Sequence, residues 1–505
     1  MKSSARILVI DAGTTGIRAL IYDETAQILA QAYTEFPQYH PLPDRVEQDA
    51  DEIWGAAEAM IKQALATAAL HPGDITAIGI TNQRATTILW DVRTGQPVTR
   101  AIVWQDTRTA DRAVELEGIW GDRVYSRTGW AIAPVYSSLS IEWVIANVAG
   151  VRELAEAGHL RFGTIDSWLI HKLTAGRTHV ISASNASVTG SYDLLTSQWY
   201  SPWLESLGIP LGIFPEVCDD SGELGVTDVA VFGAAVPIGS AIADQHSALF
   251  AQGCVEPGAV KCTHGTGTFL DMTIGTTPVI DPASGLTSQI AWRRRGETIY
   301  ALEGYAGSTG AAVQWLRDGM KIITTSAQSE DLARSVPHNG GVYVVPALTG
   351  LSAPYWDSYA RGTILGISPG TTRGHLARAT LEGIVFSVRD FVDAMSAVSG
   401  HSITRIAVDG GASKNNLLMQ LQADHLDALV ERPRNTEATS LGAALLAGLA
   451  VGVWATPAEA LSTQEIEARF QPQIDPQVRD DQYRTWKRAV ERARGWARGG
   501  GLGAE

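Results

Sequence analysis

The sequence has little cysteine, no long apolar run and no basic run. Its 505 residues include three cysteines, Cys218, Cys254 and Cys262, whose spacings contain no CxxC motif. We therefore expect reduced, buried thiols in a cytoplasmic protein. No apolar stretch approaches the roughly 18 residues that span a bilayer. The N-terminus reaches charged Arg6 before its first apolar run, so it does not resemble a signal peptide. We expect a soluble protein with no membrane partner.

The charge balance argues against a nucleic-acid partner. The formal net charge is −15, and the only basic triplet, residues 293–295, is better explained by a solvated turn. A length of 505 residues suggests two or more domains, and a hydrophobic content of 45% is ample for large cores.

The stretch from residue 7 to residue 20 organises the rest of the interpretation. Four apolar β-formers, residues 7–10, run into Asp11, and a turn of glycines and threonines at 13–16 precedes a second apolar run. This pattern predicts a buried strand, a tight turn and a second strand. Glycines let a backbone approach a phosphate, and turn amides and hydroxyls can donate to it. Asp11 is placed to hold a hydrated Mg²⁺ ion. A hairpin beside an ordinary buried aspartate is the alternative for this stretch alone.

Further apolar runs in the first half also end in polar residues. We expect a third antiparallel strand at 28–33, a capped helix up to about residue 67, a strand at 75–80 followed by the polar cluster 81–87, and an apolar run at 101–103 that leads into Trp104. Residues 110–160 look mainly helical, and a small-residue strand at 237–243 delivers Asp244. In α/β folds, ligands bind at the carboxyl ends of such strands.

The second half repeats the opening pattern. Residues 259–272 read as a strand, a Gly/Thr turn and a strand, and residues 405–416 form a third glycine-bearing strand-to-helix turn. We expect helices over 374–398 and 439–451 and a disordered tail after residue 499. Two α/β halves that each begin with such a hairpin would bind one nucleotide between them.

The motifs follow one another along the chain as D-x-G-T-T at 11–15, I-T-N-Q-R-x-T-T at 80–87, A-I-V-W-Q-D at 101–106, A-D-Q at 243–245, H-G-T-G-T-F at 264–269, P-A-L-T-G-L-x-A-P-Y-W-D at 346–357 and D-G-G-A-x-x-N at 409–415. In this order they resemble the motifs of the FGGY carbohydrate kinases. The resemblance covers roughly residues 6–455 and is closest to the glycerol kinases of that family. It implies an α/β fold with two actin-like (ribonuclease H-like) ATPase domains and a nucleotide cleft between them. The expected domains are 1–248 and 249–498, followed by a flexible tail at 499–505.

The resemblance also implies a role for each matching residue. Asp244 would be the general base that takes the proton from the attacking hydroxyl, since phosphoryl transfer needs mainly positioning and charge neutralisation. The substrate would contact Arg84, Ala85, Trp104, Val135, Tyr136, Asp244, Gln245 and Phe269. ATP would contact Thr14, Thr15, Gly16, Arg18, Thr266, Gly267, Gly310, Gln314, Gly411 and Asn415, and Asp11 would hold Mg²⁺ through water.

The departures from the family pattern concern the substrate. Glycerol kinases carry a Glu where this chain has Ala85. They carry a Tyr that is replaced here by Val135, or displaced to Tyr136 if the loop shifts, and a Lys where this chain has Ser140. A site that lacks hydrogen-bond partners rejects its old ligand by about 1–3 kcal/mol per unpaired group.

These departures predict an ATP-dependent kinase for a polyol longer than glycerol, namely erythritol, threitol or a pentitol. The alternatives are a glycerol kinase that makes glycerol 3-phosphate, a ketose or aldose kinase of the same superfamily, and a non-enzymatic actin-like ATPase. The expected partner is a small polyol, and the expected assembly is a homodimer or a homotetramer, between which the sequence does not choose.

Overall fold

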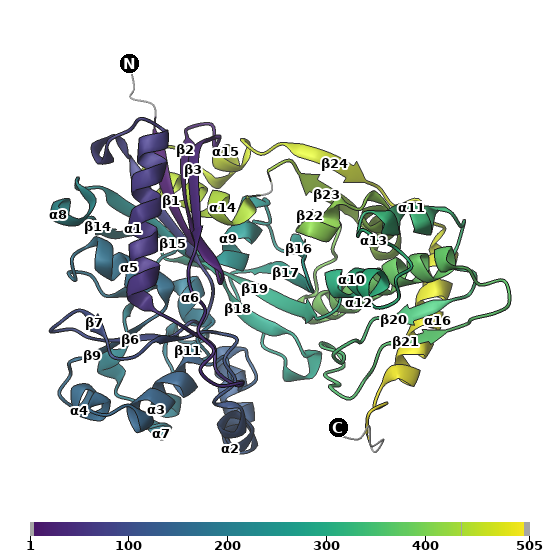
Figure 1. Ribbon diagram of the computed structural model, residues 1–505, viewed down its shortest axis with the longest axis horizontal. Helices are drawn as coiled ribbons and strands as arrows, with labels where there is room; N and C mark the ends of the chain where they lie inside the picture. The colour runs from purple at the N-terminus through teal and green to yellow at the C-terminus, as the bar shows by residue number, and fades with distance from the viewer. Residues whose placement is uncertain (1–4, 436, 499–505) are drawn as a thin grey trace.

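The computed structural model describes residues 5–435 and 437–498, so the predicted tail at 499–505 lies outside the described residues. One mixed sheet runs through the molecule in the order β24-β23-β22-β16-β17-β19-β18-β14-β15-β5-β1-β2-β3. In Figure 1 the first half of the chain lies on the left and most of the second half on the right. The two halves of the sheet join where β14 meets β18, through the single pair Ser221 and Arg294.

Each half contributes a hairpin and its neighbours to this sheet. The first half supplies β1 (Arg6–Ala12), β2 (Gly16–Asp23), β3 (Ile28–Glu35), β5 (Ala77–Asn82), β14 (Ser221–Val226) and β15 (Pro237–Ala243). The second half supplies β16 (Val260–His264), β17 (Thr268–Gly275), β18 (Thr287–Arg294), β19 (Glu297–Ala306), β22 (Arg405–Asp409), β23 (Leu429–Pro433) and β24 (Ile466–Phe470).

The two hairpins confirm the predicted repeat. β1 pairs antiparallel with β2 and parallel with β5, and β16 pairs antiparallel with β17 and parallel with β22. Six of the seven residues of β1 are buried, which explains why its sequence is a continuous apolar run rather than an alternating one.

Sixteen α-helices are described within residues 5–435 and 437–498. Those of the first half are α1 (Ala50–Thr67), α2 (Ala110–Thr128), α3 (Ser137–Asn147), α4 (Val151–Glu156), α5 (Ile165–Leu173), α6 (Ala183–Ser187), α7 (Ser201–Ser206), α8 (Val229–Phe232) and α9 (Asp244–Ala251). Those of the second half are α10 (Gly310–Asp318), α11 (Gln328–Arg334), α12 (Arg373–Ser399), α13 (Asn416–Leu426), α14 (Ala438–Ala450), α15 (Pro457–Leu461) and α16 (Pro476–Ala493). Short 3₁₀ turns occupy Pro72–Asp74, Leu211–Ile213, Pro282–Ser284 and Gly411–Lys414.

Small sheets outside the main one complete the fold. They are built from β4 (Glu47–Gln48) with β8 (Ala101–Ile102), β6 (Ile88–Asp91) with β7 (Gln96–Pro97) and β9 (Leu160–Gly163), β10 (Val180–Ser182) with β13 (Glu216–Cys218), β11 (Tyr192–Asp193) with β12 (Gln198–Trp199), and β20 (Tyr343–Val345) with β21 (Thr363–Leu365). The apolar run at 101–103 therefore gives only the two-residue strand β8, which lies outside the main sheet.

Helix α14 belongs to the second half of the chain but packs on the strands of the first. Its small residues allow this close approach: a Cβ on Gly79 of β5 would lie 2.7 Å from the Ala443 carbonyl oxygen. A Cβ on Gly442 would lie 2.0 Å from the carbonyl oxygen of Ser247 in α9. The helix is visible to the right of β1 and β15 in Figure 1. This helix therefore connects the second half of the chain to strands and helices of the first half.

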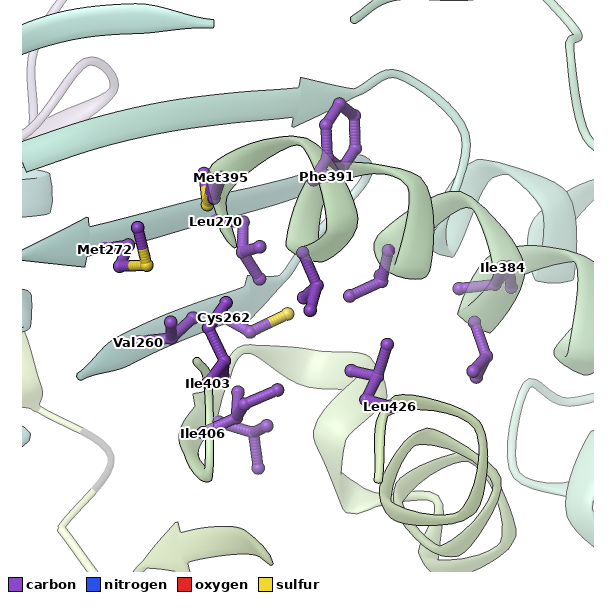
Figure 2. Packing of buried hydrophobic residues seen from close by; sticks show 14 of the residues in the cluster. Val260, Cys262, Leu270, Met272, Ile384, Phe391, Met395, Ile403, Ile406 and Leu426 are labelled. Atoms are coloured by element: carbon purple, nitrogen blue, oxygen red, sulfur yellow. The ribbon is translucent and has the colours of Figure 1, made fainter. Parts of the chain in front are cut away.

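The second half has its own apolar core between strands and helices. Figure 2 shows side chains of β16 and β17, among them Cys262 and Leu270, facing α12 with its residues Phe391 and Met395. All three cysteines are free thiols, as predicted, and Cys254 and Cys262 are buried; Cys218 is only partly buried, contrary to the prediction. Among the described residues no helix is long and apolar enough to cross a membrane.

Candidate active site

The carboxyl ends of β1, β5 and β15 bring three predicted residues to one edge of the sheet. Asp11 of β1 is in register with Thr81 of β5, and Ala243 of β15 is in register with Asn82. Arg84 follows β5, and Asp244 follows β15 as the first residue of α9. Parallel register therefore explains why carboxylates that are 233 positions apart in sequence (Asp11 and Asp244) lie near each other.

The first predicted phosphate turn lies beside an open hollow. The hollow has a volume of about 330 Å³ and is lined by Asp11, Gly13, Thr15, Gly16, Arg18 and Tyr33. Arg18 reaches 2.7 Å from an oxygen of Asp11 and also forms an ion pair with Glu437, just before α14. The hollow therefore presents backbone, a hydroxyl and a guanidinium, which are the groups that bind phosphate.

Three glutamine amides hold the carbonyl side of this turn. Gln38 and Gln48 each donate to the Thr14 carbonyl at 2.8 Å, and Gln83 donates to the Gly13 carbonyl at 3.3 Å. Gln83 also donates to the Gln48 side chain at 2.8 Å. Because these bonds fix the turn's carbonyls on one side, the turn is rigid where a phosphate would approach.

The wall residue Trp104 contacts the same turn. Its indole N–H donates to the hydroxyl of Thr14 at 3.1 Å, and 40% of the residue is exposed. Trp104 is therefore an exposed aromatic side chain beside the first phosphate turn.

Arg84 is held by acidic groups from both halves of the chain. Its guanidinium donates to Glu303 of β19 at 2.7 Å, and its Nε lies 3.7 Å from Asp244. Burial acts to raise the pKa of Glu303, but the charge of Arg84 and its hydrogen bond outweigh burial and hold that pKa below its ordinary value. Glu303 therefore stays ionised and fixes the guanidinium beside Asp244.

The environment of Asp244 suits a proton acceptor. Burial raises the pKa of its carboxyl above the ordinary value of 3.8, and the nearby charge of Arg84 opposes that rise. A carboxylate with a raised pKa is a stronger base than an exposed one.

Asp11 suits a hydrated magnesium ion. Burial raises the pKa of Asp11 to about 6, Arg18 opposes the rise, and the charges of Asp244 and Glu437 add to it. Burial and the neighbouring carboxylates disfavour ionised Asp11 despite Arg18, and a hard divalent cation would offset that cost. Mg²⁺ usually takes one or two carboxylates, with phosphates and water as its other ligands, and a lone Asp11 fits that donor set.

Phe269 supplies an aromatic surface from the second half. Its ring on β17 lies 4.6 Å, centroid to centroid, from the ring of Tyr305, its register partner on β19. Both residues share the sheet face of Glu303, which pairs with Asp271 two positions further along β17. Phe269 therefore lies on the same face of the sheet as Glu303, the residue that binds Arg84.

The loop at 134–136 resolves the alternative that the sequence leaves open. Tyr136 is fully buried, and its hydroxyl donates to the Trp130 carbonyl at 2.8 Å. Its ring packs on Gly190, where an added Cβ would lie 2.4 Å from the ring carbons. Tyr136 is therefore turned into the core and is not displaced into the position of the family's tyrosine. Val135 is half-buried, and Ala85 is buried in a left-handed backbone conformation with φ of 59°.

Removing the Tyr136 hydroxyl should therefore affect stability and not substrate binding. We expect Tyr136→Phe to lower the free energy of unfolding by about 1 kcal/mol, because the Trp130 carbonyl loses its donor. The KM for the acceptor should change less than twofold. Thermal unfolding and initial-rate kinetics measure both, and a severalfold rise in acceptor KM would instead place the hydroxyl in the site.

The second hairpin repeats the geometry of the first. A Cβ on Gly16 would lie 2.6 Å from the Thr34 carbonyl oxygen of β3, and one on Gly267 would lie 2.4 Å from the Ala306 carbonyl oxygen of β19. A tyrosine ring, Tyr33 or Tyr305, covers each glycine. Both turns therefore require glycine at the same structural position, which the low sequence identity of the two turns conceals.

The other predicted nucleotide contacts gather around the second turn. Gly310 donates its backbone N–H to the Gly265 carbonyl at 3.0 Å, and Thr309 donates to the Thr266 carbonyl at 3.0 Å. The start of α10 is thereby fixed to the turn. Gln314 lies one helical turn further along α10 and is exposed.

The third glycine turn lies against the second. A Cβ on Gly410 would lie 2.4 Å from the His264 carbonyl oxygen, whereas nothing lies within 4 Å of a Cβ on Gly411. Asn415 caps α13 by accepting from the Leu418 N–H at 2.9 Å. Gly411 therefore faces open space, whereas the side-chain oxygen of Asn415 already accepts the Leu418 N–H.

Sequence reasoning missed Glu303 and the glutamine amides. Glu303 follows three apolar residues in the run 300–304, the same signal that identified Asp11. The signal was present, but only the register of β19 shows that this carboxylate meets Arg84, 219 positions away.

Two family models match most of the chain. The N-terminal domain of the FGGY family of carbohydrate kinases matches residues 6–251, and the C-terminal domain of that family matches residues 260–451.

Full-length relatives agree with those matches. The chain is 48% identical over 493 residues to a glycerol kinase of Carboxydothermus hydrogenoformans, with 97% of this chain and 98% of the relative covered. It is 48% identical to glycerol kinase 2 of Thermotoga maritima, with 97% and 99% covered. The crystal structure of Plasmodium falciparum glycerol kinase with ADP superimposes with a TM-score of 0.93 at 32% identity, with 97% of this chain and 98% of that chain covered.

Proposed function

The chain belongs to the FGGY family of carbohydrate kinases and is an ATP-dependent kinase, and we propose that its acceptor is a terminal hydroxyl of glycerol. The observation that carries the proposal is the juxtaposition of Arg84 and Asp244 beside Glu303, in a chain 48% identical to glycerol kinases. The relatives favour glycerol over the longer polyol that the sequence departures predict.

In this proposal the chain's own carboxylate handles the proton. Asp244 takes the proton of the acceptor hydroxyl while that oxygen forms its bond to the γ-phosphorus of ATP. The bond from phosphorus to the bridging oxygen breaks, and ADP leaves. Arg84 and Gln245 orient the acceptor, with Trp104 and Phe269 as its apolar walls.

The charges around Arg84 favour an uncharged acceptor. Its guanidinium is compensated by Glu303 at 2.7 Å and by Asp244 at 3.7 Å. A sugar acid would therefore meet two carboxylates and a guanidinium whose charge they already compensate, which costs several kcal/mol in a buried site. A polyol needs only hydrogen bonds.

We assign the nucleotide to the two hairpins and the third turn. Thr14, Thr15, Gly16 and Arg18 would contact the outer phosphates from one side and Thr266 and Gly267 from the other, while Gly310, Gln314, Gly411 and Asn415 would line the rest. Mg²⁺ held by Asp11 through water would neutralise phosphate charge. We keep 248/249 as the proposed boundary between the two domains.

A polyol of four or five carbons is the second candidate, and the loop at 134–136 favours it. Val135 and Ala85 carry no hydrogen-bonding group, and the Tyr136 hydroxyl is bound to Trp130. Two groups that would hold glycerol hydroxyls are thus missing, and the replacements are smaller.

A comparison of acceptors decides between the two candidates. We expect kcat/KM for glycerol to exceed the values for erythritol, threitol, xylitol and arabinitol, each measured with saturating Mg-ATP. A tenfold preference for one of the longer polyols would transfer the proposal to the second candidate. Gluconate, as an acidic control, should not be phosphorylated.

A further inference from the structure

A row of charged side chains crosses the strands β16, β17 and β19 and ends at Arg84. Lys261 of β16 is in register with Asp271 of β17, and Asp271 is in register with Glu303 of β19. Their side chains share one face because directly paired residues on neighbouring strands point the same way. Arg84 extends the row through its hydrogen bond to Glu303 at 2.7 Å. The row therefore connects β16 with the residue proposed to bind the acceptor.

Lys261 and Asp271 form a fully buried ion pair within this row. The ammonium lies 2.8 Å from a carboxylate oxygen, and both side chains are 0% exposed. Burial acts to lower the pKa of Lys261, but Asp271 and Asp409 outweigh it and keep the amine charged. Buried ion pairs often contribute little net stability, because desolvation cancels the attraction. Stability alone is therefore a weak explanation for charges at this position.

The ammonium also contacts a residue of the acceptor site. Lys261 donates to the side-chain oxygen of Gln245 at 2.6 Å. A lysine ammonium has three donors and no acceptor, so only the oxygen of the amide can face it. The NH₂ group of Gln245 must point the other way, and it has no hydrogen-bond partner within residues 5–435 and 437–498.

We propose that Lys261, neutralised by Asp271, is a positioning residue that fixes the amide of Gln245 with its NH₂ group toward the acceptor. The acceptor pocket then presents donors from Gln245 and Arg84 and one proton acceptor, Asp244. Lone pairs of the acceptor's hydroxyls meet the donors, and the hydroxyl that reacts meets Asp244. Lys261 does not touch the acceptor, and this inference rests on the proposed role of Gln245.

The orientation is tested with Gln245→Glu and Gln245→Ala. Glutamate keeps an oxygen for Lys261 but has no NH₂ group, so both variants should raise the acceptor KM by about tenfold, the loss expected for one hydrogen bond. The KM for ATP should stay within twofold. A Gln245→Glu protein with an unchanged acceptor KM would overturn the proposed orientation.

The positioning role is tested with the paired variant Lys261→Met/Asp271→Asn, which removes both charges and leaves neither buried ion unpaired. We expect its acceptor KM to rise about tenfold in the otherwise unaltered protein. When the same two substitutions are added to the Gln245→Ala protein, the acceptor KM should rise less than twofold further, because the amide that Lys261 positions is already absent. If the paired variant raises the acceptor KM tenfold in the Gln245→Ala protein as well, Lys261 and Asp271 act independently of Gln245, which would overturn the proposal.

Two controls make the result specific. Lys487→Met/Asp390→Asn removes another Lys–Asp pair, 2.9 Å long, from α16 and α12, and should leave the acceptor KM unchanged. The acceptor in every assay is the compound that the unaltered protein phosphorylates fastest in a screen, whether a polyol or another sugar. A non-polyol acceptor would contradict the proposed function. The comparison of the paired variant in the unaltered and the Gln245→Ala proteins would still decide the role of Lys261.

Discussion

Replacing Asp244 with asparagine should lower kcat by about 10²–10⁴-fold, the usual contribution of a positioned general base. The amide has nearly the same shape but cannot take the hydroxyl proton. Arg84 stays in place in this variant because Glu303 holds its guanidinium at 2.7 Å. The KM for ATP should therefore stay within twofold. Steady-state kinetics with varied ATP and varied acceptor give both numbers.

Asp51→Asn is the matched control for that variant. Asp51 is also an aspartate in the first turn of a helix, α1, and it makes an ion pair with Lys172 at 3.2 Å. The same change of charge and shape there should leave kcat within twofold. An Asp244→Asn protein with kcat within a factor of ten of the unaltered protein would remove Asp244 as the base.

Replacing Asp11 with asparagine should lower kcat/KM for Mg-ATP by about a hundredfold, equivalent to ~2.7 kcal/mol of lost charge stabilisation. The fold should not suffer. Asp11 has a pKa raised from 3.8 to about 6 by burial, so between those values the folded protein holds a proton that the unfolded chain has lost. Stability therefore falls as pH rises through that window, and ionised Asp11 is a net cost at pH 7. The variant should unfold at a temperature no lower than the unaltered protein.

Asp23, at the other end of the same hairpin, provides a control of opposite sign. Burial acts to raise its pKa, but hydrogen bonds from Thr25 and Gln27 outweigh burial and lower it. Ionised Asp23 therefore stabilises the fold at neutral pH. Asp23→Asn should lower the melting temperature slightly and leave kcat/KM unchanged. If Asp11→Asn instead melts well below the unaltered protein in the absence of nucleotide, the assigned environment of Asp11 is wrong.

The sequence allowed correct prediction of the strands and turns that carry the site. Strands buried on both faces must be continuous apolar runs, so a polar residue at the end of such a run marks the edge where a ligand binds. This rule singles out Asp11 and Asp244 as candidates, and the register of β1, β5 and β15 brings them to one edge. The two glycine turns could also be predicted, because a side chain at Gly16 or Gly267 would collide with a neighbouring carbonyl and these positions therefore require glycine.

Contacts between distant strands could not be predicted from the sequence. That Glu303 holds Arg84, and that Lys261 reaches Gln245, depends on the register of β16, β17 and β19 and on how the halves of the sheet meet. No local pattern encodes such register. The position of Tyr136 was ambiguous by one residue, and its burial follows from a glycine 54 positions away, Gly190, which leaves room for the ring.

The choice of acceptor is where sequence departures and overall similarity differ. Ala85 and Val135 predict a longer polyol, whereas relatives at 48% identity over 97% of the chain are glycerol kinases. Two side chains govern local hydrogen bonds, but the shape of a pocket depends on all of its walls and on bound water. The conflict therefore concerns the acceptor alone and leaves the phosphoryl-transfer chemistry unaffected.

The protein should consume ATP only when a polyol hydroxyl lies beside Asp244. The most direct test measures ADP formation by the purified protein with Mg-ATP, with and without glycerol, and identifies the phosphorylated product by ³¹P NMR. ADP should form at least a hundredfold faster with the polyol, and one terminal hydroxyl should carry the phosphate. Equal ADP formation with and without any polyol, and no phosphorylated polyol, would contradict this expectation and favour an actin-like ATPase without an acceptor.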